Sequence, residues 1–192
     1  MRELVYYVAT SLDGFIADAS GDFSTFPQDP ETLAALFDRY PETCPAHLRE
    51  ALGVTGPARR FDTVVMGRRT HAPALDAGLV GGAYPHLRQV VVTHRDLPAP
   101  SGVEVVAGDV LARVAELKAE PGKDVWLCGG ADLAGQLLDL VDEIQVKVNP
   151  VLLGDGIPLF RGLGRPREVR AVAVEPLPGG VTLATYRTGR RG

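Results

Sequence analysis

The feature that most constrains the fold is a strand, a glycine pair and a helix that follow one another directly in residues 124–136. The apolar run from Val125 to Cys128 predicts a buried strand, and Gly129 and Gly130 come next. Helical spacing then resumes at Leu133, Leu137, Leu138 and Val141. Such a junction directs backbone N–H groups toward an anion, and two glycines leave room for a pyrophosphate. The alternative is a tight turn between a strand and a helix, with no ligand.

The rest of the chain predicts an α/β protein. Apolar or alternating runs predict strands at 3–9, 61–66, 89–92, 103–106, 143–149, 169–174 and 181–186, and helical spacing predicts helices at 31–40 and 47–52 and one capped by Asp109. The alternation in 143–149 indicates a strand with one solvent-exposed face. Strands that first alternate with helices and then dominate predict a mixed sheet with helices on its faces.

Size and composition narrow the class of protein. A length of 192 residues and a hydrophobic fraction of 45% fit one globular domain over 1–192. The net charge of −4 argues against a nucleic-acid partner, and the basic residues Arg187, Arg190 and Arg191 fit a solvated end. Two cysteines without ligand spacing predict no metal. No apolar run is long enough to cross a membrane and no signal peptide is evident, so we expect a cytoplasmic protein with no membrane partner.

Small or basic residues follow three of the predicted strands. The segments are Gly67-Arg68-Arg69-Thr70, Thr93-His94-Arg95 and Gly129-Gly130. Ligands of open α/β sheets bind at the carboxyl ends of the strands. A guanidinium grips a phosphate through paired hydrogen bonds, which suits the 2′-phosphate of NADP. Together the segments indicate a nucleotide site, although Arg68 and Arg69 alone also fit a solvated surface pair.

In order and spacing, these segments resemble the dihydrofolate reductase-like superfamily. The branch is that of the reductase domain of bacterial riboflavin biosynthesis, the RibD C-terminal domain. The resemblance covers nearly the whole chain and includes Ser11-Leu12-Asp13-Gly14-Phe15-Ile16-Ala17, Val65-Met66-Gly67-Arg68-Arg69-Thr70, Val91-Val92-Thr93-His94-Arg95, Leu127-Cys128-Gly129-Gly130 and Pro150-Val151-Leu152-Leu153-Gly154-Asp155-Gly156. It implies a three-layer α/β/α fold with a mixed, mostly parallel central sheet, NADPH as hydride donor and a homodimer.

The resemblance also assigns site residues. For NADPH it implies Gly67, Arg68 and Thr70 near the adenosine-side phosphates, Thr93, His94 and Arg95 around the 2′-phosphate, Gly129, Gly130, Ala131 and Leu133 along the pyrophosphate, and Ala9, Ile16 and Ala17 beside the nicotinamide. For the substrate it implies Asp13, Gly14, Asn149, Pro150, Leu153, Gly154 and Gly156.

The proton donor is open at this point. Asp13 is the first choice as catalytic residue, but its carboxylate also suits a turn residue that bonds nearby backbone. Glu31 and Asp38 on the predicted first helix are the other acids considered. Phe23, Phe26, Leu36, Phe37 and Tyr40 form either the core face of that helix region or an apolar pocket wall.

The expected function is NADPH-dependent reduction of a small heterocyclic or carbonyl substrate, similar to the 5-amino-6-(5-phosphoribosylamino)uracil reductase of riboflavin biosynthesis. The alternatives are an NADP(H)-binding protein without turnover and a module that sequesters a flat drug. For the homodimer, the predicted contact is a sheet edge formed by 143–149 and 169–186, with Val172, Val174, Val181 and Leu183.

Overall fold

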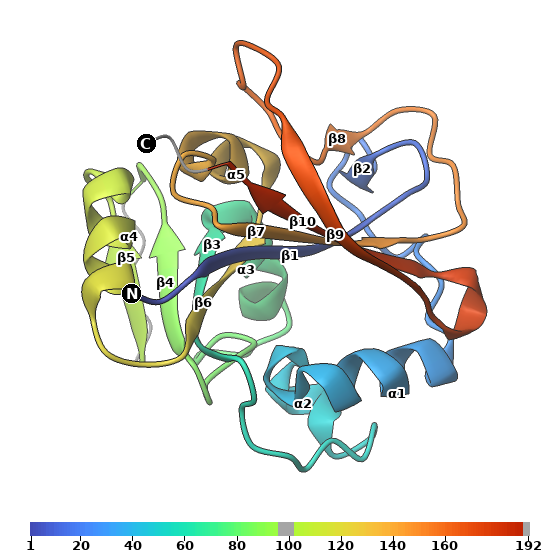
Figure 1. The fold of residues 1–192 in the computed structure, drawn as a ribbon. Helices are drawn as coiled ribbons and strands as arrows, with labels where there is room; N and C mark the ends of the chain where they lie inside the picture. The colour runs from blue at the N-terminus through green and yellow to red at the C-terminus, as the bar shows by residue number, and fades with distance from the viewer. Residues whose placement is uncertain (96–101, 190–192) are drawn as a thin grey trace.

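The computed structural model describes residues 1–95 and 102–189 and is built around one large sheet (Figure 1). The eight strands lie in the order β5-β4-β3-β6-β1-β7-β10-β9. Their bounds are β1 Leu4–Thr10, β3 Phe61–Gly67, β4 Arg88–Val92, β5 Val103–Val106, β6 Asp124–Gly129, β7 Glu143–Val148, β9 Val169–Pro176 and β10 Thr182–Thr188. Of the predicted solvated end, Arg187 is instead half-buried on β10 and pairs with Glu3 and Glu143, whereas Arg190 and Arg191 lie outside the described residues.

The sheet is mixed and mostly parallel. The first six strands in the sheet order, from β5 through β4, β3, β6 and β1 to β7, all pair in parallel. Strand β10 is antiparallel to both β7 and β9. A separate two-stranded sheet joins β2 (Phe15–Ala17) to β8 (Ile157–Pro158). This arrangement confirms the predicted fold class.

Helices cover both faces of the sheet, which makes the three layers of Figure 1. The helices are α1 Pro30–Arg39, α2 Ala46–Arg49, α3 Arg68–Asp76, α4 Val110–Ala119 and α5 Ala131–Leu137, with 3-10 turns at Pro41–Thr43 and Pro178–Gly180. As predicted, Asp109 caps α4 by accepting a hydrogen bond from the N–H of Ala112 at 3.0 Å. None of the described helices is long and apolar enough to cross a bilayer.

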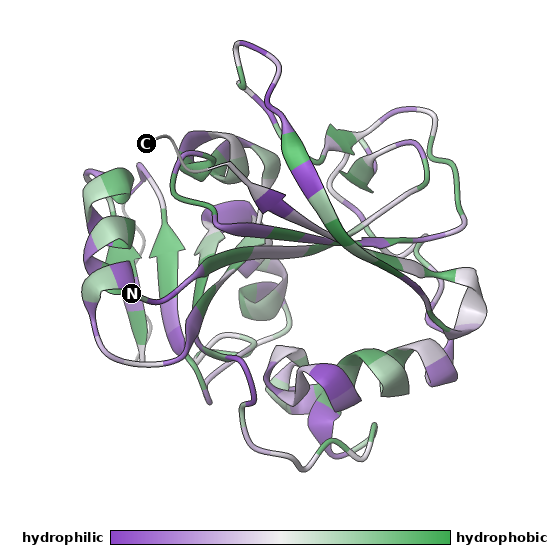
Figure 2. Cartoon of the chain, viewed as in Figure 1, coloured by the Kyte–Doolittle hydropathy of each residue, from purple (hydrophilic) through white to green (hydrophobic). Residues whose placement is uncertain are grey.

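Each face of the sheet has its own hydrophobic core, and the apolar strands between them stand out in Figure 2. Residues of α4 and α5, such as Val114 and Leu137, pack on one face. On the other face, Leu36 and Tyr40 at the end of α1 pack against Tyr7, Phe61 and other aromatic rings of the sheet. Of the aromatic residues considered before α2, Phe26 is also buried, while Phe37 is half-buried.

Three further features, all of the strands at the β9 side of the sheet, differ from the sequence prediction. The polar face of β7 is not solvent-exposed, because Glu143 and Gln145 are buried beside Arg60 and Tyr40. Strand β7 is interior, so β9 alone is the edge strand on that side. Val181 and Leu183 are buried within the chain and cannot contact a second copy, whereas Val172 and Val174 of β9 are exposed.

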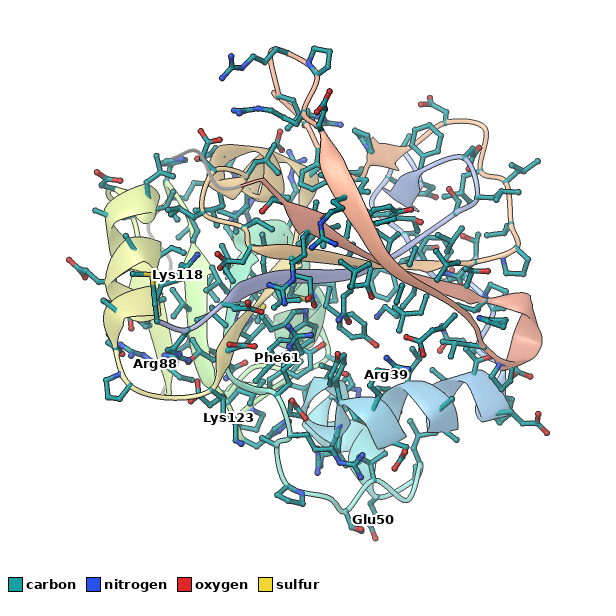
Figure 3. The ribbon with its side chains drawn as sticks, viewed as in Figure 1. Arg39, Glu50, Phe61, Arg88, Lys118 and Lys123 are labelled. Atoms are coloured by element: carbon teal, nitrogen blue, oxygen red, sulfur yellow. The ribbon has the colours of Figure 1, made fainter. Side chains whose placement is uncertain are left out.

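A buried carboxylate organises the entry to β3. Glu42 is fully buried and accepts hydrogen bonds from the backbone N–H groups of Arg59 (3.0 Å), Arg60 (2.7 Å) and Phe61 (2.7 Å). The Arg60 side chain continues to Glu143 at 2.8 Å, which ties β3 to β7. Figure 3 labels Phe61 at this level and Arg39 of α1, whose guanidinium pairs with Glu175 of β9.

Candidate functional site

The three strand-end segments meet at one edge of the sheet. Strands β4, β3 and β6 are neighbours and parallel, and the register pairs Gly67 with Val92 and Met66 with Gly129. Thr93 follows β4 directly, so all three segments lie side by side at the carboxyl edge. The backbones come close there, since a Cβ at Gly67 would lie 3.7 Å from the carbonyl oxygen of Gly129.

Two helices begin at this edge without a side-chain cap. Gly67 is the N-cap of α3 and Gly130 that of α5, and neither offers a side-chain acceptor, whereas Asp29 and Asp109 cap α1 and α4. The peptide between Gly129 and Gly130 is cis. The first N–H groups of α3 and α5 therefore have no acceptor from a capping side chain. Backbone N–H groups in this arrangement suit a phosphate.

Basic side chains surround the same edge. Arg68 is half-buried, while Arg69, His94 and Arg95 are exposed, and none of the three arginines pairs with a carboxylate of the described residues. Buried Thr93 fixes the turn after β4, because its Oγ1 accepts a hydrogen bond from the N–H of Arg95 at 3.0 Å. Free guanidinium groups next to uncapped helix ends form a concentrated positive region.

The first turn of α5 offers its backbone only. Ala131 and Leu133 are buried, and Leu133 belongs to the core beneath α4 and α5. Thr70 of α3 faces the glycine pair, since a Cβ at Gly130 would lie 3.7 Å from its Oγ1. The structure therefore limits the predicted role of Leu133 to its N–H group.

The residues predicted beside the nicotinamide lie on β1, the strand next to β6, and on β2 of the small sheet. Ala9 is half-buried near the end of β1, which neighbours β6. Ile16 is half-buried and Ala17 is buried on β2, which pairs with β8. The late loop, defined as residues 149–160, follows β7. The N–H of Leu159 in this loop donates to the carbonyl oxygen of Gly14 at 3.0 Å, so the loop after β1 and the late loop support each other.

Asp13 holds the late loop. Its exposed carboxylate accepts hydrogen bonds from the backbone N–H groups of Leu153 (3.2 Å) and Gly154 (2.7 Å). Hydrogen bonds from the Ser11 hydroxyl and these amides hold the pKa of Asp13 below its ordinary value. These backbone bonds join two segments that are distant in the sequence, which differs from the turn-residue alternative, and a catalytic role for Asp13 stays a prediction.

The acids of α1 point away from the sheet. Glu31 and Asp38 are both exposed, and Asp38 pairs with Arg59 at 3.2 Å. Neither carboxylate lies among the buried side chains that α1 turns toward the sheet, which are Thr32 and Leu36. We therefore drop both acids as candidates for the proton donor.

We expect Asp13→Ala to loosen the late loop without unfolding the chain. The amides of Leu153 and Gly154 lose their acceptor, so their hydrogen exchange should accelerate, which mass spectrometry of the 150–156 region measures. In the native chain this protection should also weaken in acid, because a lowered pKa gives stabilisation that is lost as the pH falls through the folded-state pKa. Asp76→Ala, at an exposed position, is the control; equal exchange in both variants would contradict the assignment.

The other late-loop residues divide into two groups. The side chain of buried Asn149 donates to the carbonyl oxygens of Thr10 (3.0 Å) and Lys147 (3.1 Å), so it joins β1 to β7. Pro150 is exposed and Leu153 is half-buried, which leaves both available to a ligand. Gly156 packs against the backbone at Ala17, where a Cβ would overlap the carbonyl oxygen. Gly156 thus keeps β2 and β8 together, and its contact with substrate stays a prediction.

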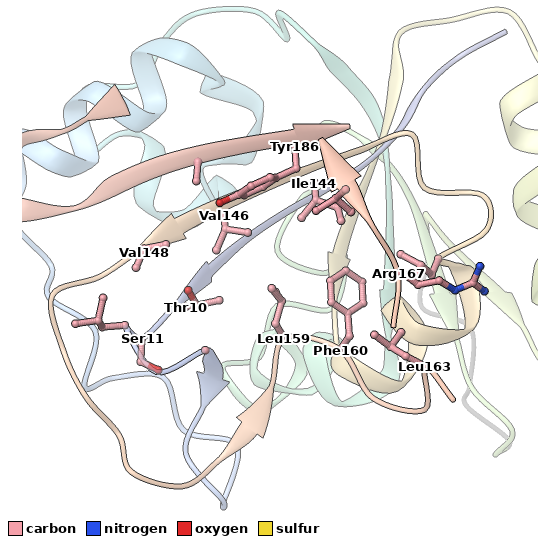
Figure 4. A pocket seen from close by; sticks show the side chains of 15 residues that line it. Thr10, Ser11, Ile144, Val146, Val148, Leu159, Phe160, Leu163, Arg167 and Tyr186 are labelled. Atoms are coloured by element: carbon pink, nitrogen blue, oxygen red, sulfur yellow. The ribbon is translucent and has the colours of Figure 1, made fainter. Parts of the chain in front are cut away.

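An apolar pocket of about 390 Å³ lies on the face of β7 that is opposite to α1 (Figure 4). Its lining includes Ile144, Val146 and Val148 of β7 and Leu159 and Phe160 of the late loop. The pocket includes Thr10, Ser11 and Gly14 but none of the three strand-end segments. It is therefore separate from the basic edge of the sheet.

Sequence reasoning missed two polar side chains at the end of the α1-facing surface, Cys128 of β6 and Lys147 of β7. Both are half-buried, and the Lys147 ammonium lies 4.0 Å from the centre of the Tyr7 ring. The alternation of β7 places Lys147 on one face with Glu143 and Gln145, but it does not show what packs against that face. The described residues hold no group of His, Cys, Asp or Glu side chains arranged for a metal.

The fold and this edge define a dihydrofolate reductase-like α/β protein. A family model described as the RibD C-terminal domain matches residues 2–183, and the chain belongs to that family. Two uncharacterised Bacillus subtilis (strain 168) proteins are similar over most of their length: YyaP is 26% identical over 96% of this chain and 94% of its own, and YwjB is 28% identical over 88% of each. The dihydrofolate reductase HdrB of Haloferax volcanii is 34% identical over 50% of each chain.

Solved structures agree with this assignment. A Shewanella sp. PV-4 protein provisionally named for riboflavin biosynthesis superposes with a TM-score of 0.69 at 26% identity, covering 99% of this chain and 100% of its own. Enterococcus faecalis dihydrofolate reductase, solved with NADP(H), gives 0.66 at 15% identity over 97% of this chain and 96% of its own. At that identity the second likeness concerns the fold alone.

Proposed function

We propose that the protein is an NADPH-dependent reductase of a small heterocyclic or carbonyl compound. The observation that carries the proposal is the meeting of three strand-end segments at one edge, with unpaired arginines and uncapped backbone N–H groups. Membership of the RibD C-terminal domain family supports it. The narrower prediction, a riboflavin-pathway reductase, draws support from the Shewanella protein's provisional name.

The residues at the edge fit NADPH by shape and charge. Gly67, Gly129 and Gly130 lack side chains where a pyrophosphate would approach. A Cβ on Gly67 or Gly130 would project into the space between α3 and the glycine pair. Arg68 and Thr70 would hold the adenosine-side phosphates, and Thr93 to Arg95 the 2′-phosphate. When bound, NADPH supplies the hydride, and the protein contributes orientation and a proton.

The experiment that tests the proposal compares NADPH with NADH by isothermal titration. Arg95→Ala should weaken NADPH binding by about 10-fold or more, since a charge-assisted hydrogen bond contributes about 1.5–3 kcal/mol. NADH lacks the 2′-phosphate and should lose no affinity. Arg170→Ala removes an exposed arginine of β9 and is the control. Equal NADPH affinity in both variants would contradict the 2′-phosphate assignment.

A second candidate is NADP(H) binding without turnover. It is favoured by the absence, among the described residues of α1, of a carboxylate facing the sheet. Steady oxidation of NADPH with a pteridine, pyrimidine or quinone would exclude it. Tight binding of a flat drug in the absence of NADPH would instead favour the drug-sequestering module.

We further propose a cytoplasmic homodimer with no nucleic-acid or membrane partner. Edge strand β9 supports the dimer, because Val169, Val172 and Val174 are all exposed on it. The apolar pocket beside β9 and β10 adds exposed apolar surface. Sedimentation at micromolar concentration should give the mass of two chains, and Val172→Glu with Val174→Lys should give one.

A further inference from the structure

Three neighbouring strands share an opening on the face that α1 covers. Deeper on this face, Tyr7, Trp126 and Gln145 are buried. Nearer the carboxyl edge, Ala9, Cys128 and Lys147 are only half-buried, and the register pairs Ala9 with Lys147. The surface is therefore closed at the amino end of the strands and open at the end where the glycine pair lies. These half-buried side chains form the open end of this face, beside the glycine pair and therefore beside the proposed NADPH edge.

Lys147 is the cation at this open end, and no carboxylate of the described residues pairs with its ammonium. The ammonium lies over the face of the Tyr7 ring, and the described residues accept no hydrogen bond from it. The carboxylate of Glu143, at the other end of β7 on the same face, is paired with Arg60 and Arg187. Cys128 supplies no charge, because burial raises the pKa of its thiol to about 12. An ammonium has three N–H donors, and a ring face satisfies one side only.

The other two lysines of the chain behave differently. Lys118 is buried and pairs with Asp142, and Lys123 is exposed just before β6, at the far end of the sheet (Figure 3). Burial lowers the pKa of Lys147 to about 8, because the charged ammonium loses hydration there. Uncompensated charges of this kind concentrate at functional sites.

We propose that Lys147 recognises the substrate and selects a planar compound that carries an oxygen acceptor, such as a ring carbonyl, an enolate or a carboxylate. This inference rests on the proposed function, because the open end of this face adjoins the NADPH edge. A substrate oxygen placed at Nζ would accept the hydrogen bond for which the described residues offer the ammonium no acceptor. A protonated diaminopyrimidine ring would instead require a carboxylate at this position to accept its hydrogen bonds. The acids of α1 point away from this position, so the site favours an oxygen acceptor over such a cation.

The test uses orotate, a planar oxopyrimidine carboxylate, and 2,4-diaminopyrimidine as probes, each titrated calorimetrically into the NADPH-saturated protein. The native chain should bind orotate in preference to the diaminopyrimidine. Lys147→Met should weaken orotate binding by about 10-fold or more, the size expected for a lost charged hydrogen bond. Lys147→Arg, which keeps the cation, should retain most of the affinity. Lys123→Met is the matched control and should change nothing.

Thermal unfolding of the same variants separates recognition from a structural role. Removing an unpaired, half-buried charge should leave the melting temperature of Lys147→Met equal to or above that of the native chain. A lower melting temperature with unchanged orotate affinity would make Lys147 structural and overturn the inference. So would a native chain that binds NADPH but not orotate, or that prefers the diaminopyrimidine. Failure of the native chain to bind NADPH itself would refute the proposed function instead.

Discussion

Gly130→Ala is expected to abolish tight NADPH binding while leaving the fold intact. Gly130 has a negative φ of −97°, which alanine adopts readily, and its new Cβ would lie 3.7 Å from Thr70 Oγ1, an ordinary contact. The same methyl group would project into the crevice between the glycine pair and α3. Loss of close backbone approach to the pyrophosphate should weaken binding by about 10- to 100-fold, the equivalent of one charge-assisted hydrogen bond.

Isothermal titration with NADPH measures this effect, and the melting temperature of the free protein checks the fold. Gly108→Ala is the matched control, because Gly108 is exposed and a Cβ there would meet no atom within 4 Å. If both alanine variants bind NADPH as the native chain does, the glycine pair is only a turn between β6 and α5.

Glu42→Ala is expected to give a large loss of stability. The fully buried carboxylate accepts three backbone N–H groups at the start of β3, and alanine would leave all three without an acceptor. Each buried donor left unsatisfied costs about 1–3 kcal/mol, so we expect at least about 3 kcal/mol in the free energy of unfolding. For a chain of this size that corresponds to a fall of roughly 6–12 °C in the melting temperature.

Chemical denaturation and calorimetry test this expectation. Glu50→Ala is the control, since Glu50 is exposed after α2, lies at the periphery of Figure 3 and makes no side-chain hydrogen bond within the described residues. A Glu42→Ala variant as stable as Glu50→Ala would show that water replaces the carboxylate without loss.

Local patterns predicted most of the fold. The strand, glycine and helix junction at 124–136 and the cap at Asp109 depend on near neighbours in the chain, and both were confirmed. Helix α3 was missed because Pro73 lies inside it and few apolar residues mark its buried face. The buried polar face of β7 was missed because alternation reports which side chains share a face, not what covers that face.

The candidate site was predicted in part. The meeting of Gly67, Thr93 and Gly129 followed from the rule that ligands bind at the carboxyl ends of parallel strands. Glu42 and Lys147 could not be singled out, because their partners lie on segments distant in the sequence: Phe61 in one case and Tyr7 in the other. Such contacts depend on the packed fold and leave no periodic trace in the chain.

The central claim, that the carboxyl edge of the sheet is an NADPH site, is tested most directly by a thermal-shift titration of the native chain with NADPH and NADH in parallel. A ligand that binds the folded state alone, at about 100 times its dissociation constant, adds about 2.7 kcal/mol of stability. For this chain we predict a rise of about 5 °C or more with NADPH, by the same size scaling of melting temperatures. The rise with NADH at the same concentration should be clearly smaller. Unchanged melting temperatures with both nucleotides would contradict the account.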